Sequence, residues 1–166
     1  MKNYTKTDKL TYIALLTALA TLLVGFPRVP NGVGGIIHTS DSIIYITAIF
    51  FGPLAGAFVG GIGHSFANII FGPQIFAPWT LVIKAIMGLV VGLIAKGHVK
   101  GARKWTALVC GTVILVVAYF VANYFLFDLE VAIASILPLS IQGVAGMVVT
   151  VALLPIVNKI LGGKRL

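Results

Sequence analysis

The stretch "WTLVIKAIMGLVVGLIAKG", residues 79–97, is an almost continuous apolar run with one lysine, Lys84, inside it. A helix needs about 20 such residues to cross the ~30 Å hydrocarbon core of a bilayer. A cation near the middle of that helix costs on the order of 2.5 kcal/mol or more. The stretch therefore predicts a membrane helix, and it raises the question of what compensates the charge of Lys84.

The composition extends this interpretation to the whole chain. The 166 residues are 59% hydrophobic and 10% charged, and their mean hydropathy is +1.08. Soluble domains contain about 25% charged residues, so the composition predicts an integral membrane protein whose surroundings are the lipid bilayer. The net charge of +8 does not indicate a nucleic-acid partner, because the basic residues lie between apolar runs and do not line one soluble face.

Glycines, prolines and charged clusters divide the chain into six apolar segments. They predict an all-α integral membrane protein, a six-transmembrane-helix bundle that forms a single domain over residues 1–166. The predicted spans cover about residues 10–26, 36–51, 53–71, 78–95, 105–127 and 132–160. The second span is the shortest, and the F-G-P sequence at 51–53 joins it to the third in a tight helical hairpin.

Charge predicts the orientation of these spans. Most Lys and Arg residues fall on one side of the six segments: Lys2, Lys6, Lys9, Lys96, Lys100, Arg103, Lys104, Lys159, Lys164 and Arg165. The positive-inside rule places that side in the cytoplasm, and an even number of spans places both the N- and the C-terminus there. Arg28 lies in an opposite loop, on the side that also holds Asp41, Asp128 and Glu130.

Polar side chains of five predicted spans gather in the outer half of the membrane. At ~1.5 Å per residue, Lys84 lies about 9 Å below the outer start of its helix, and His38 and Asp41 begin the second helix. The candidate binding residues are His38, Asp41, Asn68, Trp79, Lys84, Tyr119, Asn123 and Gln142. The inner halves hold mainly Thr, Gly and aliphatic residues, so the layout predicts a pocket open to the outside.

Helical spacing predicts which way these side chains face. Lys84 shares a face with Gly88 and Gly92, a stripe of small residues on which helices pack closely. His38, Asp41, Ser42 and Tyr45 have the spacing of one polar stripe along the second helix. Each polar stripe is therefore expected to point into the bundle.

Structural roles are the alternative for the same residues. His64 and Asn68 can serve as interhelical hydrogen bonds, tyrosines can pack at the interface, and Lys84 with Asp41 can form a structural ion pair. A metal site built from His38, Asp41 and His64 is conceivable, but histidine and aspartate occur at this spacing often by chance. We expect no metal, no cofactor and, from the apolar surroundings of Cys110, only a packing role for that residue.

Four sequence features together resemble a known family. They are the G-x-I-H-x-x-D sequence at 35–41, the F-G-P joint at 51–53, the glycine-rich segment after it, and "APWTLVIKAIMG" at 77–88. In this order they resemble the substrate-binding S component of energy-coupling factor (ECF) vitamin transporters. The similarity is greatest to the group for hydroxymethylpyrimidine, pyridoxine and riboflavin. It covers nearly the whole chain and is strongest over residues 34–95.

The resemblance implies a high-affinity binding subunit of an ABC importer in the prokaryotic plasma membrane. It implies an ECF module as partner, consisting of a membrane scaffold subunit and two ATPases, and an alanine motif on the first helix that docks on it. Here that motif falls on Ala14 and Ala18. The chain has no G-x-x-x-x-G-K-[ST] loop for a nucleotide, so we expect no enzymatic activity from it.

Two other function classes compete with this one. A self-sufficient secondary carrier would use Lys84, Asp41 and His64 as a proton relay, but the chain shows no convincing inverted repeat. A small membrane enzyme would use His38, Asp41 and His64, but no nucleophile–base motif accompanies them. Aromatic residues beside one lysine and one aspartate favour a small neutral or zwitterionic heterocycle. With the resemblance, the expected order is pyridoxine-type vitamers, then hydroxymethylpyrimidine or thiamine-related compounds, then riboflavin.

Overall fold

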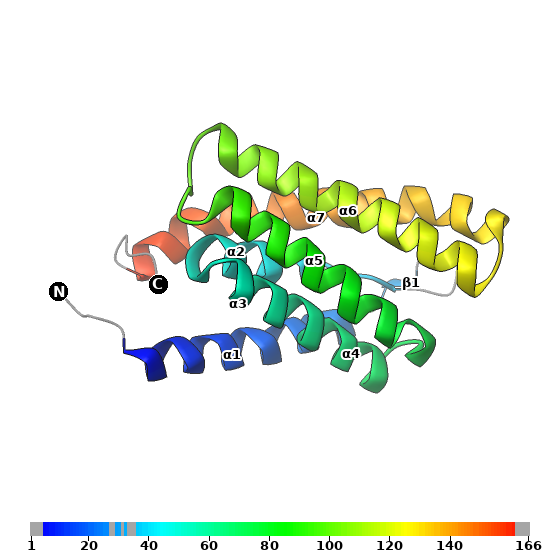
Figure 1. The fold of residues 1–166 in the computed structure, drawn as a ribbon, viewed down its shortest axis with the longest axis horizontal. Coiled ribbons are helices and arrows are strands. Elements are labelled where there is room, and N and C mark those ends of the chain that lie inside the picture. Colours follow the sequence, from blue (N-terminus) through cyan, green and yellow to red (C-terminus); the bar gives the residue numbers. More distant parts are fainter. Residues whose placement is uncertain (1–4, 27–28, 31, 33–35, 162–166) are drawn as a thin grey trace.

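The computed structural model describes residues 5–26, 29–30, 32 and 36–161. Lys2, Arg28, Gly35, Lys164 and Arg165 lie outside the described residues. The elements in chain order are α1 (Lys6–Gly25), β1 (Val29–Pro30), β2 (Ile36–Ile37), α2 (Asp41–Phe51), α3 (Pro53–Phe58), η1 (Val59–Gly63), α4 (His64–Ile70), η2 (Gln74–Phe76), α5 (Ala77–Ala95), α6 (Ala102–Leu126) and α7 (Leu129–Ile160). The helices lie side by side in an elongated bundle (Figure 1).

The predicted helical bundle is confirmed in its main features. Within the described residues, five helical stretches are long and apolar enough to cross a membrane: Lys6–Gly25, Pro53–Ile70, Gln74–Ala95, Ala102–Leu126 and Leu129–Ile160. The remaining apolar helix, α2, has 11 residues, which corresponds to roughly 16 Å at the usual helical rise. The count of six membrane spans therefore stays a prediction.

The helix α2 lies in the interior of the bundle, and every residue from Asp41 to Phe50 is buried. The chain leaves it through Gly52, whose φ of 95° is a conformation that glycine adopts readily. Pro53 then occupies the first turn of α3, where its missing N–H has no partner to lose. The F-G-P sequence thus produces the tight joint between the two helices.

The predicted second span, 36–51, is wrong at its start. Ile36 and Ile37 pair antiparallel with Pro30 and Val29, and the helix begins only at Asp41. The reason is that the β-branched isoleucines find backbone partners in β1, which a helix would not permit. His38 consequently lies in the segment before α2 and is not part of a polar helical stripe.

The segment after the hairpin contains a π-helical turn, η1, between α3 and α4. A Cβ added at Gly60 would lie 2.6 Å from the carbonyl oxygen of Lys84, and one at Gly61 would lie 2.9 Å from that of Leu81. These glycines therefore let η1 contact the backbone of α5 directly at the level of Lys84. Close packing of small residues, a common feature of membrane helices, holds this part of α5 in place.

The described charges divide between the two ends of the bundle. The helix α1 begins and α7 ends at the same end, where the α5–α6 connection also lies (Figure 1). This end holds Lys6, Lys9, Lys96, Lys100, Arg103, Lys104 and Lys159. Asp128 caps the start of α7 at the opposite end, with Glu130 in its first turn. The distribution has the form that the positive-inside rule requires.

Candidate functional site

A single buried carboxylate, that of Asp41, brings four helices together. Lys84 on α5 donates to its Oδ1, and the Nε2 atom of Gln142 on α7 donates to its Oδ2 at 2.8 Å. The Nε2 atom of His64 on α4 lies 3.5 Å from Oδ1. Asp41 itself is the first residue of α2. We name these four residues the Asp41 cluster.

These contacts explain how a lysine persists inside an apolar helix. Lys84 is 1% exposed and Asp41 is fully buried, so both charges have lost their water. A buried ion pair is tolerable only when further hydrogen bonds satisfy its remaining polar atoms. Here Gln142 supplies one such bond, the positive end of α2 faces the carboxylate, and the ring of Tyr119 lies 5.7 Å from the Lys84 ammonium.

Two histidines meet at the hydroxyl of Ser40, beside this cluster. The Ser40 Oγ atom lies 2.7 Å from Nδ1 of His38 and 2.8 Å from Nε2 of His64, and the two rings are 5.5 Å apart. A hydroxyl has one hydrogen to donate, so at least one of these contacts needs an imidazole N–H as donor. The tautomers of His38 and His64 are therefore coupled through Ser40.

Three of these residues, His38, Asp41 and His64, could together hold a metal ion. The ligand atoms of His38, Asp41 and His64 lie within 4.8 Å of one another, and imidazole with carboxylate suits zinc. However, the Asp41 carboxylate already accepts from Lys84 and Gln142, so a divalent cation would lie beside an ammonium group. The arrangement favours a hydrogen-bond network over a metal centre.

A second polar cluster lies next to the first and joins α4, α5 and α6. The Nδ2 atom of Asn68 donates to Oγ1 of Thr80 at 2.7 Å, and the same oxygen is 2.7 Å from the hydroxyl of Tyr119. Phe76 packs on this tyrosine, with ring centroids 6.3 Å apart. We name Asn68, Thr80 and Tyr119 the Thr80 cluster. Tyr119 connects the two clusters because its ring also faces Lys84.

The two remaining predicted site residues, Asn123 and Trp79, belong to neither cluster. Asn123 is buried one helical turn beyond Tyr119 on α6. Trp79 is half-buried and stacks on Phe125, with centroids 6.3 Å apart and an interplanar angle of 11°. Since Phe125 is 69% exposed, Trp79 lies towards the outer surface of α5 and α6, and the structure brings it into neither cluster.

Sequence reasoning did not select Ser40 and Thr80 as site residues. Thr80 precedes Lys84 by four residues, so it shares the face of the small-residue stripe, and this spacing was a usable signal. Ser40 had no such signal, because its position between two histidines depends on how the chain turns from β2 into α2. His64 was selected only as an alternative, and it lies at the centre of the network.

The predicted docking residues, Ala14 and Ala18, lie on a different surface. Both are exposed on α1, beside the exposed side chains of Leu15 and Leu22. They make a face of small and apolar residues that no other described element covers.

Comparison with known proteins supports a transport role. Residues 4–159 match the family described as "ECF-type riboflavin transporter, S component". A Pyrococcus woesei protein described as "Uncharacterized protein in gap 3'region" is 33% identical over 144 residues, which is 87% of this chain and 95% of that protein. A UPF0397 protein of Clostridium perfringens (strain SM101 / Type A) is 29% identical over 96 residues, which is 57% of this chain and 51% of that protein. The chain thus spans about half the length of this UPF0397 relative.

A solved structure has the same fold. It is described as "Structure and mechanism of the S component of a bacterial ECF transporter", and it superimposes with a TM-score of 0.76 at 21% sequence identity. The match covers 95% of this chain and 99% of that one.

Proposed function

The chain belongs to the family of ECF-type riboflavin transporter S components, and on that premise we propose that it binds a small heterocyclic B-vitamin or vitamin precursor at the Asp41 and Thr80 clusters. Membership makes it a substrate-binding subunit of an ECF transporter, which is a transport subunit and not an enzyme. The resemblance seen in the sequence is therefore confirmed at the level of the family.

The observation that carries the proposal is the buried ion pair of Asp41 and Lys84 beside an aromatic surface. The lysine offers N–H donors and the Asp41 carboxylate, which also accepts from Nε2 of Gln142, offers acceptor oxygens. Tyr119 with Phe76 offers ring faces. Such a combination suits a planar heterocycle that carries hydroxyl groups or ring nitrogens.

The charge of the site favours a neutral or zwitterionic ligand. Within the described part of the site, the ammonium of Lys84 is balanced by the carboxylate of Asp41, so a polyanion would bring charge without a counter-ion. The proposed order of ligands is pyridoxine-type vitamers, then hydroxymethylpyrimidine or thiamine-related compounds, then riboflavin. Folate and phosphorylated vitamins come last.

Coupling to transport is proposed to use the face of α1 around Ala14 and Ala18. The partner would be an ECF module, with a membrane scaffold subunit and two ATPases. The Lys-rich end of the bundle would face the cytoplasm of a prokaryotic cell, with both termini on that side. Exposed small residues support this role because they let another helix approach closely.

The test begins with the ligand. Mass spectrometry of small molecules that co-purify with the protein should find a B-vitamin or precursor. Calorimetric titration with pyridoxine, hydroxymethylpyrimidine, thiamine, riboflavin, folate and cobalamin should then rank them. A response to folate, cobalamin or a metal ion alone would contradict the assignment.

Lys84→Met tests the proposed role of the ion pair in binding. The substitution keeps the length of the side chain and removes the charge, so affinity should fall about 10- to 100-fold, as expected for the loss of a charged hydrogen bond. Lys96→Met, at an exposed position, is the matched control and should bind as wild type does. If Lys84→Met folds and binds the ligand with unchanged affinity, the proposed role of Lys84 in binding is wrong and its role is structural.

A further inference from the structure

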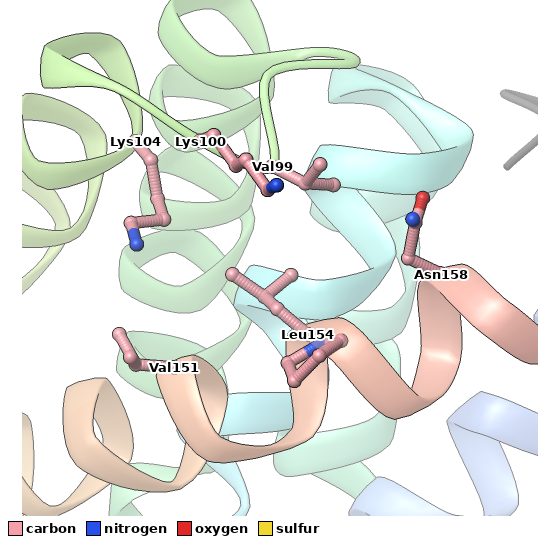
Figure 2. Close-up of a pocket in the computed structure, with 7 residues that line it drawn as sticks. Val99, Lys100, Lys104, Val151, Leu154 and Asn158 are labelled. Carbon is pink, nitrogen blue, oxygen red and sulfur yellow. The ribbon is translucent and has the colours of Figure 1, made fainter.

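A cavity of about 330 Å³ lies at the Lys-rich end of the bundle, between the α5–α6 connection and α7. The connection contributes Val99 and Lys100, the first turn of α6 contributes Lys104, and α7 contributes Leu154 and Asn158 (Figure 2). A water molecule takes up about 30 Å³ in the liquid, so the cavity has room for a polyatomic group. The cavity is separate from the Asp41 and Thr80 clusters, because no residue of either cluster lines it.

The charged side chains that line this cavity in the described part of the chain are positive. Two of the residues that line it, Lys100 and Lys104, carry a positive charge, and the described lining contains no acid. Asp128 and Glu130 belong to the opposite end of the bundle, and Asp8, in the first turn of α1, is not among the residues that line the cavity. The first turn of α6 contains no acid, and its N-cap, Gly101, provides no side-chain hydrogen bond. The positive end of that helix therefore adds to the charge of the lysines.

The apolar part of the cavity wall continues along α7. Val151 and Pro155 line the cavity, and at helical spacing they share a face with Ile141, Val144 and Val148. These three side chains are 53%, 55% and 63% exposed. The face is thus an apolar stripe that begins at the cavity and runs toward the other end of the bundle. A soluble anion would gain nothing from this stripe, whereas an acyl chain would pack along it.

We propose that this cavity binds the phosphate headgroup of an anionic phospholipid. Lys100 and Lys104 bind the phosphate, Asn158 offers a hydrogen bond to the headgroup, and the α7 stripe contacts the acyl chain. Basic pockets between membrane helices at the cytoplasmic side bind lipid headgroups in this way. The lipid would hold the α5–α6 connection against α7 at the end of the bundle where partner subunits are expected.

Native mass spectrometry of the purified protein in detergent tests the proposal. The protein is titrated with phosphatidylglycerol and, separately, with phosphatidylcholine of the same acyl chains, and the phosphatidylglycerol should bind more tightly. Replacing both cavity lysines, Lys100→Gln with Lys104→Gln, should weaken phosphatidylglycerol binding about 30-fold, or about fivefold for each lysine. Both positions are at the protein surface or partly exposed, so the variant should fold.

The matched control removes the same charge from the same end of the bundle. Lys6→Gln with Lys9→Gln alters two exposed residues of α1, and phosphatidylglycerol binding should stay within about twofold of wild type, since screening limits remote charges. An equal loss in the control would show that general surface charge attracts the lipid, and it would overturn the proposal. Equal affinity for phosphatidylcholine would overturn it as well.

A third arm distinguishes lipid from a free anion. Inorganic phosphate and glycerol 3-phosphate should fail to displace bound phosphatidylglycerol at millimolar concentration, because they lack the acyl chain that the stripe of α7 contacts. Displacement by either compound would identify a site for soluble anions and would contradict the proposed lipid binding. Unchanged lipid binding in the cavity variant, together with lost uptake in cells, would instead assign the lysines to a partner protein.

Discussion

The helices α1 and α2 differ in how far they are buried, and this difference fits the separate roles proposed for them in partner docking and in substrate binding. Of the 20 residues of α1, only Ala20, Val24 and Gly25 are buried, whereas α2 is buried from Asp41 to Phe50. The buried helix carries the carboxylate on which the polar network converges. The exposed helix presents alanine and leucine and takes no part in that network. The proposed substrate contact of α2 and the proposed partner contact of α1 should therefore be separable by mutation. Three sets of substitutions test this, in order from the largest expected effect on the isolated protein to the smallest.

Asp41→Asn should have the largest effect. It leaves the Lys84 ammonium buried without a counter-charge, and breaking a buried pair in this way costs about 3–5 kcal/mol of unfolding free energy. Thermal unfolding in detergent, followed by circular dichroism, measures the loss. The double variant Asp41→Asn with Lys84→Met removes the orphaned charge and should recover much of the stability. An Asp41→Asn protein as stable as wild type would mean that Lys84 is not held by this carboxylate.

The Asp41 network also shows what the sequence could and could not predict. The apolar runs located the long helices to within a few residues, because hydrophobic length and charged boundaries are local properties. The position of His38 was missed, since the pairing of Ile36 and Ile37 with β1 is a contact between separate segments. The Ser40 bridge and the stacking of Trp79 on Phe125 also depend on side chains that meet only after the bundle packs.

The π-helical turn was not predicted either, and its cause is packing. No residue pattern in Val59–Gly63 distinguishes a π-helix from an α-helix with several glycines. The turn is frequent at functional sites, and here it brings the glycines of η1 against two neighbours, α5 on one side and α1 on the other. Substitutions within η1 can therefore compare the effect of disturbing the contact with α5, which carries Lys84, with the effect of disturbing the contact with α1.

Gly60→Ala should have the next largest effect. The added Cβ would lie 2.6 Å from the Lys84 carbonyl, so the α5 backbone has to shift, at a cost of about 1–3 kcal/mol for overpacking. Ligand affinity, measured by calorimetry, should fall with stability because Lys84 moves. Gly63→Ala in the same turn is the control: its Cβ would face Thr17 of α1 at 3.1 Å. It should cost less and leave affinity unchanged. Equal affinity loss in both variants would contradict a specific coupling of η1 to Lys84.

Substitution of the exposed alanines should have the smallest effect on the isolated protein. Ala14→Trp with Ala18→Trp places bulk on a face of α1 that no described element covers, and surface changes of this kind stay within about 0.5 kcal/mol of unfolding free energy. Unfolding temperature and ligand affinity should therefore match wild type. Vitamin uptake by cells should be abolished, because a partner helix can no longer approach the small-residue surface. Loss of binding and uptake together would indicate misfolding, and normal uptake would refute the docking role. A variant that binds but does not transport would show that α1 acts in coupling while α2 acts in recognition.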